Sequence, residues 1–168
     1  MGKSPRRTVT AARLADGRRC FTLHDANRAL VLVKRILADV TEDYARLVDL
    51  QEIIDAAQLG DIGRQARRAQ EDILIVAERL QHCAEEIEQI GVELKDWSVG
   101  VVDFPCAAGG RLVHLCWRLG EPEVAYWHEV DAGFAERRPI HVLLKMGHSP
   151  TGPLLTGGDA EHAENKIS

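Results

Sequence analysis

The chain has 168 residues, of which 45% are hydrophobic and 28% are charged, and its formal net charge is −5. These values predict one soluble globular domain, and the negative charge disfavours a general nucleic-acid binder, which needs a basic face. No apolar run approaches the roughly 20 residues of a membrane span, and the N-terminus lacks the apolar segment of a secretory signal, so a cytoplasmic location is expected. The cysteines have no Cys-x-x-Cys spacing and predict no disulfide framework.

Residues 1–20 contain six basic side chains against the single acidic Asp16 and show no periodicity. They are interpreted as a disordered basic leader. The alternative is an arm that contacts an acidic partner or nucleic acid. The folded domain is expected over residues 21–145, and a second disordered segment over 146–168, where Gly, Pro and His dominate.

Two long helices are predicted next. Thr22 is placed to cap the first, with Asp25 as the acidic member of a capping box. Apolar residues then recur at steps of four and three as far as Ala57, which predicts a helix over about 23–58 that is roughly 50 Å long. After a break at Gly60, a second apolar seam runs from Ile62 to Ile90. The short link makes the pair an antiparallel, coiled-coil-like hairpin over 22–91.

The apolar stripe of the second helix is wider than a two-helix pair requires. Leu74, Ile75 and Ala77 flank its seam, so something else must cover that surface. The region after Gly91 is one candidate, and a second copy of the chain is the other. A homo-oligomer, most simply a dimer, is therefore expected.

The period changes to two in the β region, predicted over 97–130. A Val-rich strand over 98–104 is expected to end at Pro105 and to be followed by a loop over 106–110. Further strands are predicted over 111–118 and 124–128, on either side of a tight turn, with a short last element over 140–144. The expected fold class is α+β: the helical hairpin followed by a small three-stranded antiparallel sheet near its open end.

A candidate metal site follows from the pairing of the last two strands. Only one register keeps the apolar Leu115 and Trp117 on the same face as Trp127, and this register also places His114 and Cys116 beside Tyr126 and His128. A His-x-Cys pair on one strand can chelate an ion, and His128 can supply a third ligand. A carboxylate can come from Asp103, Glu121 or Glu129. Such ligands suit zinc or another transition metal. The alternative is that these residues merely form the polar face of a strand.

A second group of charged residues lies near the same sheet. It consists of Lys95, Asp96, Asp103, Arg118 and Glu121. These residues can support acid–base chemistry, or they can form ordinary salt bridges. The chain contains no Gly-rich phosphate loop, no nucleophile elbow and no His-Glu-x-x-His motif.

Several short motifs together resemble one family of proteins. They are Phe21-Thr-Leu with Ala26-Asn27, Gly91 with Leu94-Lys95-Asp96, Gly100 with Val102-Asp103-Phe104-Pro105, Cys116-Trp117-Arg118 with Gly120-Glu121, and Trp127-His128 with Gly133-Phe134 and Arg137. Over residues 21–139 the chain resembles the prokaryotic domain of unknown function 2203. The resemblance implies a small prokaryotic cytoplasmic protein and no particular reaction. His114 is not part of this pattern, which favours Cys116, Glu121, His128 and Asp103 as site residues.

The leading functional prediction is a non-enzymatic binding or interaction protein that forms a homo-oligomer. The alternative is a metal-binding protein, with hydrolase activity as one form of it, built on Cys116 and His128. A third interpretation, a nucleic-acid accessory factor that uses the basic leader, conflicts with the acidic remainder of the chain.

Overall fold

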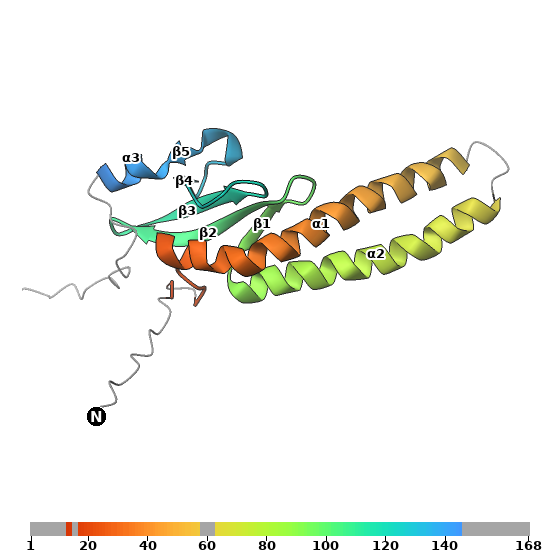
Figure 1. The fold of residues 1–168 in the computed structure, drawn as a ribbon, viewed down its shortest axis with the longest axis horizontal. Helices are drawn as coiled ribbons and strands as arrows, with labels where there is room; N and C mark the ends of the chain where they lie inside the picture. The colour runs from red at the N-terminus through yellow and green to blue at the C-terminus, as the bar shows by residue number, and fades with distance from the viewer. Residues whose placement is uncertain (1–12, 15–16, 58–62, 146–168) are drawn as a thin grey trace, which may run out of the picture.

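The computed structural model describes residues 13–14, 17–57 and 63–145. Helix α1 (Leu23–Ala57) and helix α2 (Gly63–Ile90) run antiparallel, and an antiparallel sheet packs at the end of the hairpin where α1 begins and α2 ends (Figure 1). The predicted helical hairpin and the α+β class are confirmed. Among the described residues, no helix combines the length and apolar character that a membrane crossing requires.

The sheet has five strands in the order of the chain, so the prediction of three strands was wrong. They are β1 (Glu93–Asp96), β2 (Val101–Ala108), β3 (Arg111–Arg118), β4 (Tyr126–Glu129) and β5 (Arg138–Pro139). A 3-10 turn (Phe134–Glu136) and helix α3 (Ile140–Lys145) flank β5. The two missed strands are the edge strands. Both lack the β-branched and aromatic residues that indicate a strand, because three of the four residues of β1 are charged and β5 is an exposed Arg-Pro pair.

The start of α1 has the predicted capping box. The Thr22 hydroxyl accepts a hydrogen bond from the Asp25 backbone N–H (3.1 Å), and the Asp25 carboxylate accepts one from the Thr22 N–H (3.4 Å). Each bond satisfies an amide that the first helical turn leaves without a partner. Beyond the cap, the predicted seam is buried at Ala26, Leu30, Val33, Leu37, Val40 and Leu50.

Pro105 was predicted to end its strand, but it lies within β2 opposite His114. The Pro105 carbonyl accepts a hydrogen bond from the Phe21 N–H at 2.7 Å on the side where β1 has already ended. A proline is tolerated there because the N–H that it lacks would also point to this outer side, away from β3. Strand β2 continues to Ala108, and Gly109 and Gly110, with φ of 59° and 79°, form the two-residue turn into β3.

One face of the sheet forms the main core with the helices. Phe104, Leu115, Trp117 and Trp127 are completely buried in one cluster with Val33 and Leu37 of α1. Two polar contacts fix α1 against the segment after β3: the Asn27 side-chain oxygen accepts from the Val124 N–H (2.9 Å), and the Lys34 ammonium donates to the Pro122 carbonyl (3.0 Å). The hairpin extends well beyond the sheet (Figure 1).

The predicted leader and tail fall mostly outside the described residues, which exclude 1–12, 15–16 and 146–168; the link at 58–62 is excluded too. The described part of the leader contacts the sheet. Leu14 and Cys20 are buried beside Ala107, whose N–H donates to the Cys20 sulfur at 3.2 Å. This segment therefore brings Arg18 to the edge of β1, where it contacts Glu93.

Candidate metal centre

The second face of the sheet carries the candidate site, and we call it the polar face. Asp103 of β2 lies opposite Glu93 on one side and Cys116 on the other. Two residues before Cys116 on β3, His114 lies opposite His128 of β4. Directly opposed residues share a face, so the predicted pairing of His114 and Cys116 with His128 and Tyr126 is confirmed.

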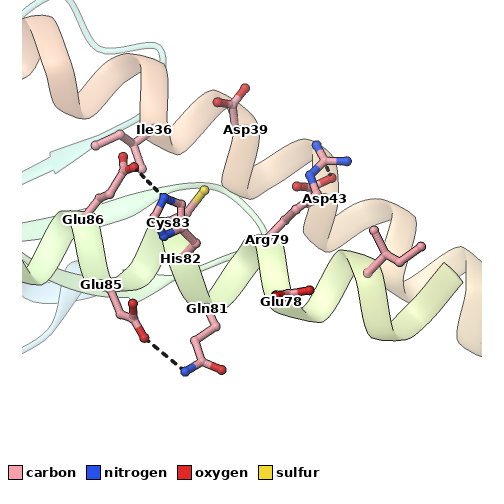
Figure 2. A pocket seen from close by; sticks show the side chains of 11 residues that line it. Ile36, Asp39, Asp43, Glu78, Arg79, Gln81, His82, Cys83, Glu85 and Glu86 are labelled. Carbon is pink, nitrogen blue, oxygen red and sulfur yellow. Dashed lines mark hydrogen bonds and ion pairs between the residues drawn. The ribbon is translucent and has the colours of Figure 1, made fainter. Parts of the chain in front are cut away.

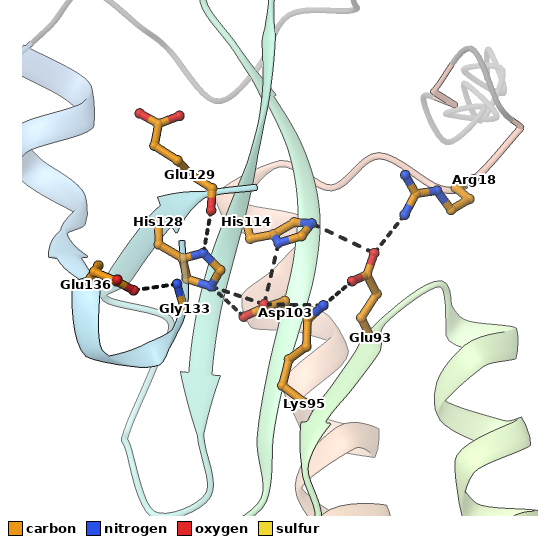
Figure 3. Close-up of polar contacts among 9 residues, drawn as sticks. All are labelled: Arg18, Glu93, Lys95, Asp103, His114, His128, Glu129, Gly133 and Glu136. Carbon is orange, nitrogen blue, oxygen red and sulfur yellow. Dashed lines mark hydrogen bonds and ion pairs between the residues drawn. The ribbon is translucent and has the colours of Figure 1, made fainter. Parts of the chain in front are cut away.

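Three polar side chains meet at the centre of this face (Figure 3). Asp103, His114 and His128 are 1%, 3% and 3% exposed, and each offers a ligand atom within 4.8 Å of the other two. A metal held at about 2.0–2.2 Å by three such atoms in tetrahedral geometry needs them roughly 3.4 Å apart. The two histidines lie on adjacent strands and Asp103 lies on a third, so the group links β2, β3 and β4.

His128 is oriented by a backbone contact. Its Nδ1 lies 2.7 Å from the Glu129 carbonyl oxygen. Because a carbonyl can only accept, Nδ1 carries the proton and donates it. This leaves Nε2 directed at Asp103, 3.1 Å from each carboxylate oxygen. Metal-binding histidines are commonly oriented in this way, with one ring nitrogen donating to a carbonyl and the other free for the ion.

His114 has a different environment. Its Nδ1 lies 3.5 Å from Asp103 Oδ2 and its Nε2 lies 3.8 Å from Glu93 Oε1, and neither nitrogen makes a hydrogen bond to any described residue. Burial lowers the pKa of His114, and this effect exceeds the opposing effect of the Asp103 and Glu93 carboxylates. The imidazole is therefore held neutral, which is the form that binds a metal.

Cys116 lies next to the three residues but is not one of them. It is fully buried opposite Asp103, and its sulfur does not belong to the group of mutually close ligand atoms. Burial raises the pKa of the Cys116 thiol, and the Asp103 carboxylate raises it further. Without a metal, this cysteine is a protonated thiol rather than a reactive thiolate.

Glu93, Lys95 and Arg18 form the edge of the site. The Lys95 ammonium lies 2.6 Å from Glu93 Oε2 and 4.0 Å from Asp103 Oδ2, and the Arg18 guanidinium lies 2.7 Å from Glu93 Oε1. Burial alone would raise the pKa of Glu93, but the hydrogen bond from Lys95, with the nearby Lys95 and Arg18 charges, holds it below its ordinary value. Sequence patterns do not identify Glu93 or Arg18 as site residues, because β1 has no strand-like pattern and Arg18 belongs to the leader.

The other predicted carboxylates lie away from the three central residues. Glu121 pairs with Arg137 at 3.0 Å and accepts a hydrogen bond from the Arg118 backbone N–H. Glu129 pairs with Arg111 at 2.9 Å, and only its backbone carbonyl contacts His128. The acid–base group divides in the same way, because Lys95 and Asp103 lie at the site while Asp96 caps the turn at Ser98.

Neither the curated proteins nor the solved structures contain a match to this chain. A family profile does match, over residues 19–140, which covers the helical hairpin, all five strands and every residue of the three-residue centre. The resemblance expected over 21–139 is therefore confirmed, and the chain belongs to the family described as uncharacterized conserved protein (DUF2203).

Proposed function

We propose that the protein binds one divalent transition-metal ion through Asp103, His114 and His128. The observation that carries this proposal is the environment of His114, a buried imidazole with no hydrogen-bond partner on either nitrogen among the described residues. Buried polar atoms are nearly always satisfied, and leaving one without a partner costs about 1–3 kcal/mol. A metal ion between His114 and Asp103 removes that cost.

The hydrogen bonding of His128 supports the same proposal. With the proton of a neutral ring on Nδ1, Nε2 has a lone pair, yet it faces two carboxylate oxygens at 3.1 Å. Two groups that only accept hydrogen bonds repel one another unless a positive charge lies between them. That charge is either a proton, which makes an imidazolium–carboxylate pair, or a metal ion shared by His128 and Asp103. Only the metal ion also gives neutral His114 a partner.

The ligand set restricts the metal. Two imidazoles with one carboxylate suit Zn²⁺, Fe²⁺, Mn²⁺ and Co²⁺ rather than Ca²⁺ or Mg²⁺, which prefer oxygen ligands. Glu93, whose Oε1 lies 3.8 Å from His114 Nε2, and Cys116, which lies opposite Asp103, are additional donors beside the site. If one of them completes the coordination, the site is closed and structural, as the ligand burial favours. The metal then joins three strands of a protein that performs no reaction. This combines the metal binding of the alternative prediction with the non-enzymatic role of the leading one.

A metal-dependent hydrolase is the second candidate. Three protein ligands leave a coordination position for water, and a partly exposed side chain, Lys95, lies at one edge of the site. The absorption spectrum of the Co²⁺-loaded protein separates the two candidates. A closed site gives a spectrum that added azide does not change. An open site gives a spectrum that azide shifts. That result would justify a screen for hydrolase activity.

Metal content tests the proposal directly. Untagged protein, purified without chelators, is analysed by inductively coupled plasma mass spectrometry beside His114→Gln, His128→Gln and Asp103→Asn. We expect close to one metal ion per chain in the native protein and strong loss in each variant. His24→Gln is the matched control, because His24 is exposed at the start of α1. Equal metal content in the native protein and all four variants, or none after reconstitution with each of the four ions, would refute the proposal.

A further inference from the structure

Charged residues are segregated along the exposed face of α2. The first turns carry Arg64, Arg67 and Arg68, all exposed. The middle carries Leu74 and Ile75, which are 72% and 58% exposed. The end carries Glu78, Glu85 and Glu86. The face is therefore mainly basic at one end, apolar in the middle and mainly acidic at the other, with Glu71 and Arg79 as exceptions on either side of the apolar centre.

This arrangement is unfavourable for an isolated helix. The N-terminus of a helix carries a partial positive charge and its C-terminus a partial negative charge, so acidic residues stabilise the start and basic residues the end. Helix α2 has no acidic residue in its first turn and no basic residue in its last. Within the described part of the chain, Arg64, Arg67 and Arg68 form no ion pair, so no acidic partner there offsets the cost.

The acidic end adjoins a groove between the helices. The groove has a volume of about 740 Å³, and both helices contribute carboxylates to it, including Asp39, Asp43, Glu78, Glu85 and Glu86 (Figure 2). Asp43 is 2% exposed; its Oδ1 pairs with Arg79 at 3.0 Å, while its buried Oδ2 has no partner among the described residues. A groove with an unsatisfied buried carboxylate oxygen suits a positively charged occupant.

We propose that α2 pairs in an antiparallel direction with α2 of a second copy of the chain, across a two-fold axis near Ile75. Charge complementarity identifies the occupant, because the basic end of one copy then lies at the acidic end and groove of the other. Arg64 and Glu86 lie eleven positions before and after Ile75, so they face one another across the axis. Glu71 and Arg79 lie four positions before and after it and do the same. Both pairs have opposite charges, and spacings of four and eleven keep all of them on the face of Ile75.

The apolar centre completes the interface. A two-fold axis places Ile75 against its own copy, with Leu74 beside it, which removes from water the two most exposed large apolar residues of α2. The two hairpins then form a four-helix arrangement along the part that extends beyond the sheet. The interface uses none of the residues of the metal centre, so either proposal can fail without the other.

The pairing is tested by reversing the charge at position 64 and then restoring complementarity with a second reversal at position 86. Arg64→Glu replaces each attraction between positions 64 and 86 across the axis with a repulsion between two carboxylates. We expect the dimer dissociation constant, measured by sedimentation equilibrium, to rise about tenfold or more. Arg64→Glu/Glu86→Arg restores opposite charges and is expected to bring that constant back toward the native value. The two positions are about 33 Å apart along one helix, so a contact within one chain cannot explain the rescue.

A second variant tests the centre. Ile75→Arg places like charges on the axis and is expected to give a monomer of 18.6 kDa with native helix content by circular dichroism, because Ile75 is exposed within the chain. A native protein that is monomeric at tens of micromolar would overturn the proposal. A dimer that persists in Ile75→Arg would also overturn it. So would a dimer whose dissociation constant is unchanged by Arg64→Glu, or is not restored when Glu86→Arg is added to Arg64→Glu.

Discussion

His114 and His128 face one another directly across β3 and β4, with ring centroids 5.4 Å apart and ring planes at 86°. In this edge-to-face arrangement, both rings reach the same carboxylate, that of Asp103 on β2. The contact between the two histidines therefore connects three strands at the centre of the sheet. This connection makes the stability of the sheet depend on what the three side chains bind.

Metal removal should accordingly lower the thermal stability of the protein. A ligand that binds only the folded state stabilises it by about 2.7 kcal/mol at one hundred times its dissociation constant. We expect the metal-loaded protein to melt several degrees higher than the chelated protein, and the difference to vanish in His114→Gln. Calorimetry with and without a chelator measures it. An equal shift in His114→Gln would mean that the metal acts at another place.

The capping box of α1 should stabilise the folded state measurably. Thr22→Ala removes the hydroxyl that bonds the Asp25 N–H and carboxylate, and loss of such a cap costs about 1 kcal/mol. Urea denaturation measures the change in the free energy of unfolding. Thr41→Ala is the control, because its hydroxyl donates to a carbonyl of the preceding turn of the same helix and caps nothing. An equal loss in both variants would contradict the special role of Thr22.

The same cap predicts a dependence on pH. The side-chain hydrogen bond from Thr22 is the main reason why the pKa of Asp25 lies below its ordinary value, against an opposing effect of burial. A carboxyl whose pKa is lower in the folded state stabilises that state above the unfolded pKa of about 3.9, and the contribution is lost as the pH falls through the folded pKa. Thr22→Ala should therefore lose less stability than the native protein as the pH falls from about 5 to about 2. Parallel acid-unfolding curves for the two proteins would contradict this.

Much of the site could be predicted from the sequence, because a strand has a period of two. The alternation of Leu115 and Trp117 with His114 and Cys116 determines which side chains share a face, whatever the lengths of the strands. The position of Asp103 opposite Cys116 depends instead on where β2 turns. A proline usually ends a strand, so the sequence predicts that the strand ends at Pro105, before its actual end at Ala108. The register between β2 and β3 therefore cannot be predicted from the sequence.

Glu93 could not be recognised because the residues around it carry no strand pattern. β1 forms because the residues after Gly91, where α2 ends, meet the free edge of β2. Strand formation here is a tertiary effect rather than a local preference of the residues. Arg18 was missed for a similar reason. The leader looks featureless, and its contact with Glu93 exists only because Phe21 and Cys20 fix the segment along β2. Period and capping predict local structure, whereas edge contacts between distant segments leave no periodic signal.

The reactivity of the cysteines should follow their burial. All four are free thiols; Cys20, Cys106 and Cys116 are buried, and Cys83 is partly exposed on α2. Burial raises the pKa of Cys106 to about 12, so it stays protonated at about pH 8. We expect a thiol reagent to modify Cys83 first and the buried thiols only on unfolding, as counted by absorbance with and without denaturant. Rapid labelling that persists in Cys83→Ser would contradict this order.

Gly91→Ala should be among the most destabilising substitutions outside the core. Gly91 ends α2 with φ of 92°, a conformation that other residues adopt only at a cost of roughly 1–2 kcal/mol. A Cβ added there would also lie 2.7 Å from the Cβ of Arg19, which is too close for either backbone to remain in place. The variant should therefore lose more stability than strain alone predicts, and the leader segment that carries Arg18 should move away from Glu93.

Gly63→Ala is the matched control for this substitution, because a Cβ at Gly63 meets no atom of the described residues within 4 Å. We expect the control to change the free energy of unfolding by less than about 1 kcal/mol in either direction. Urea denaturation of both variants measures the comparison. Equal stability of Gly91→Ala and Gly63→Ala would mean that neither the left-handed conformation of Gly91 nor its close approach to Arg19 exists in solution.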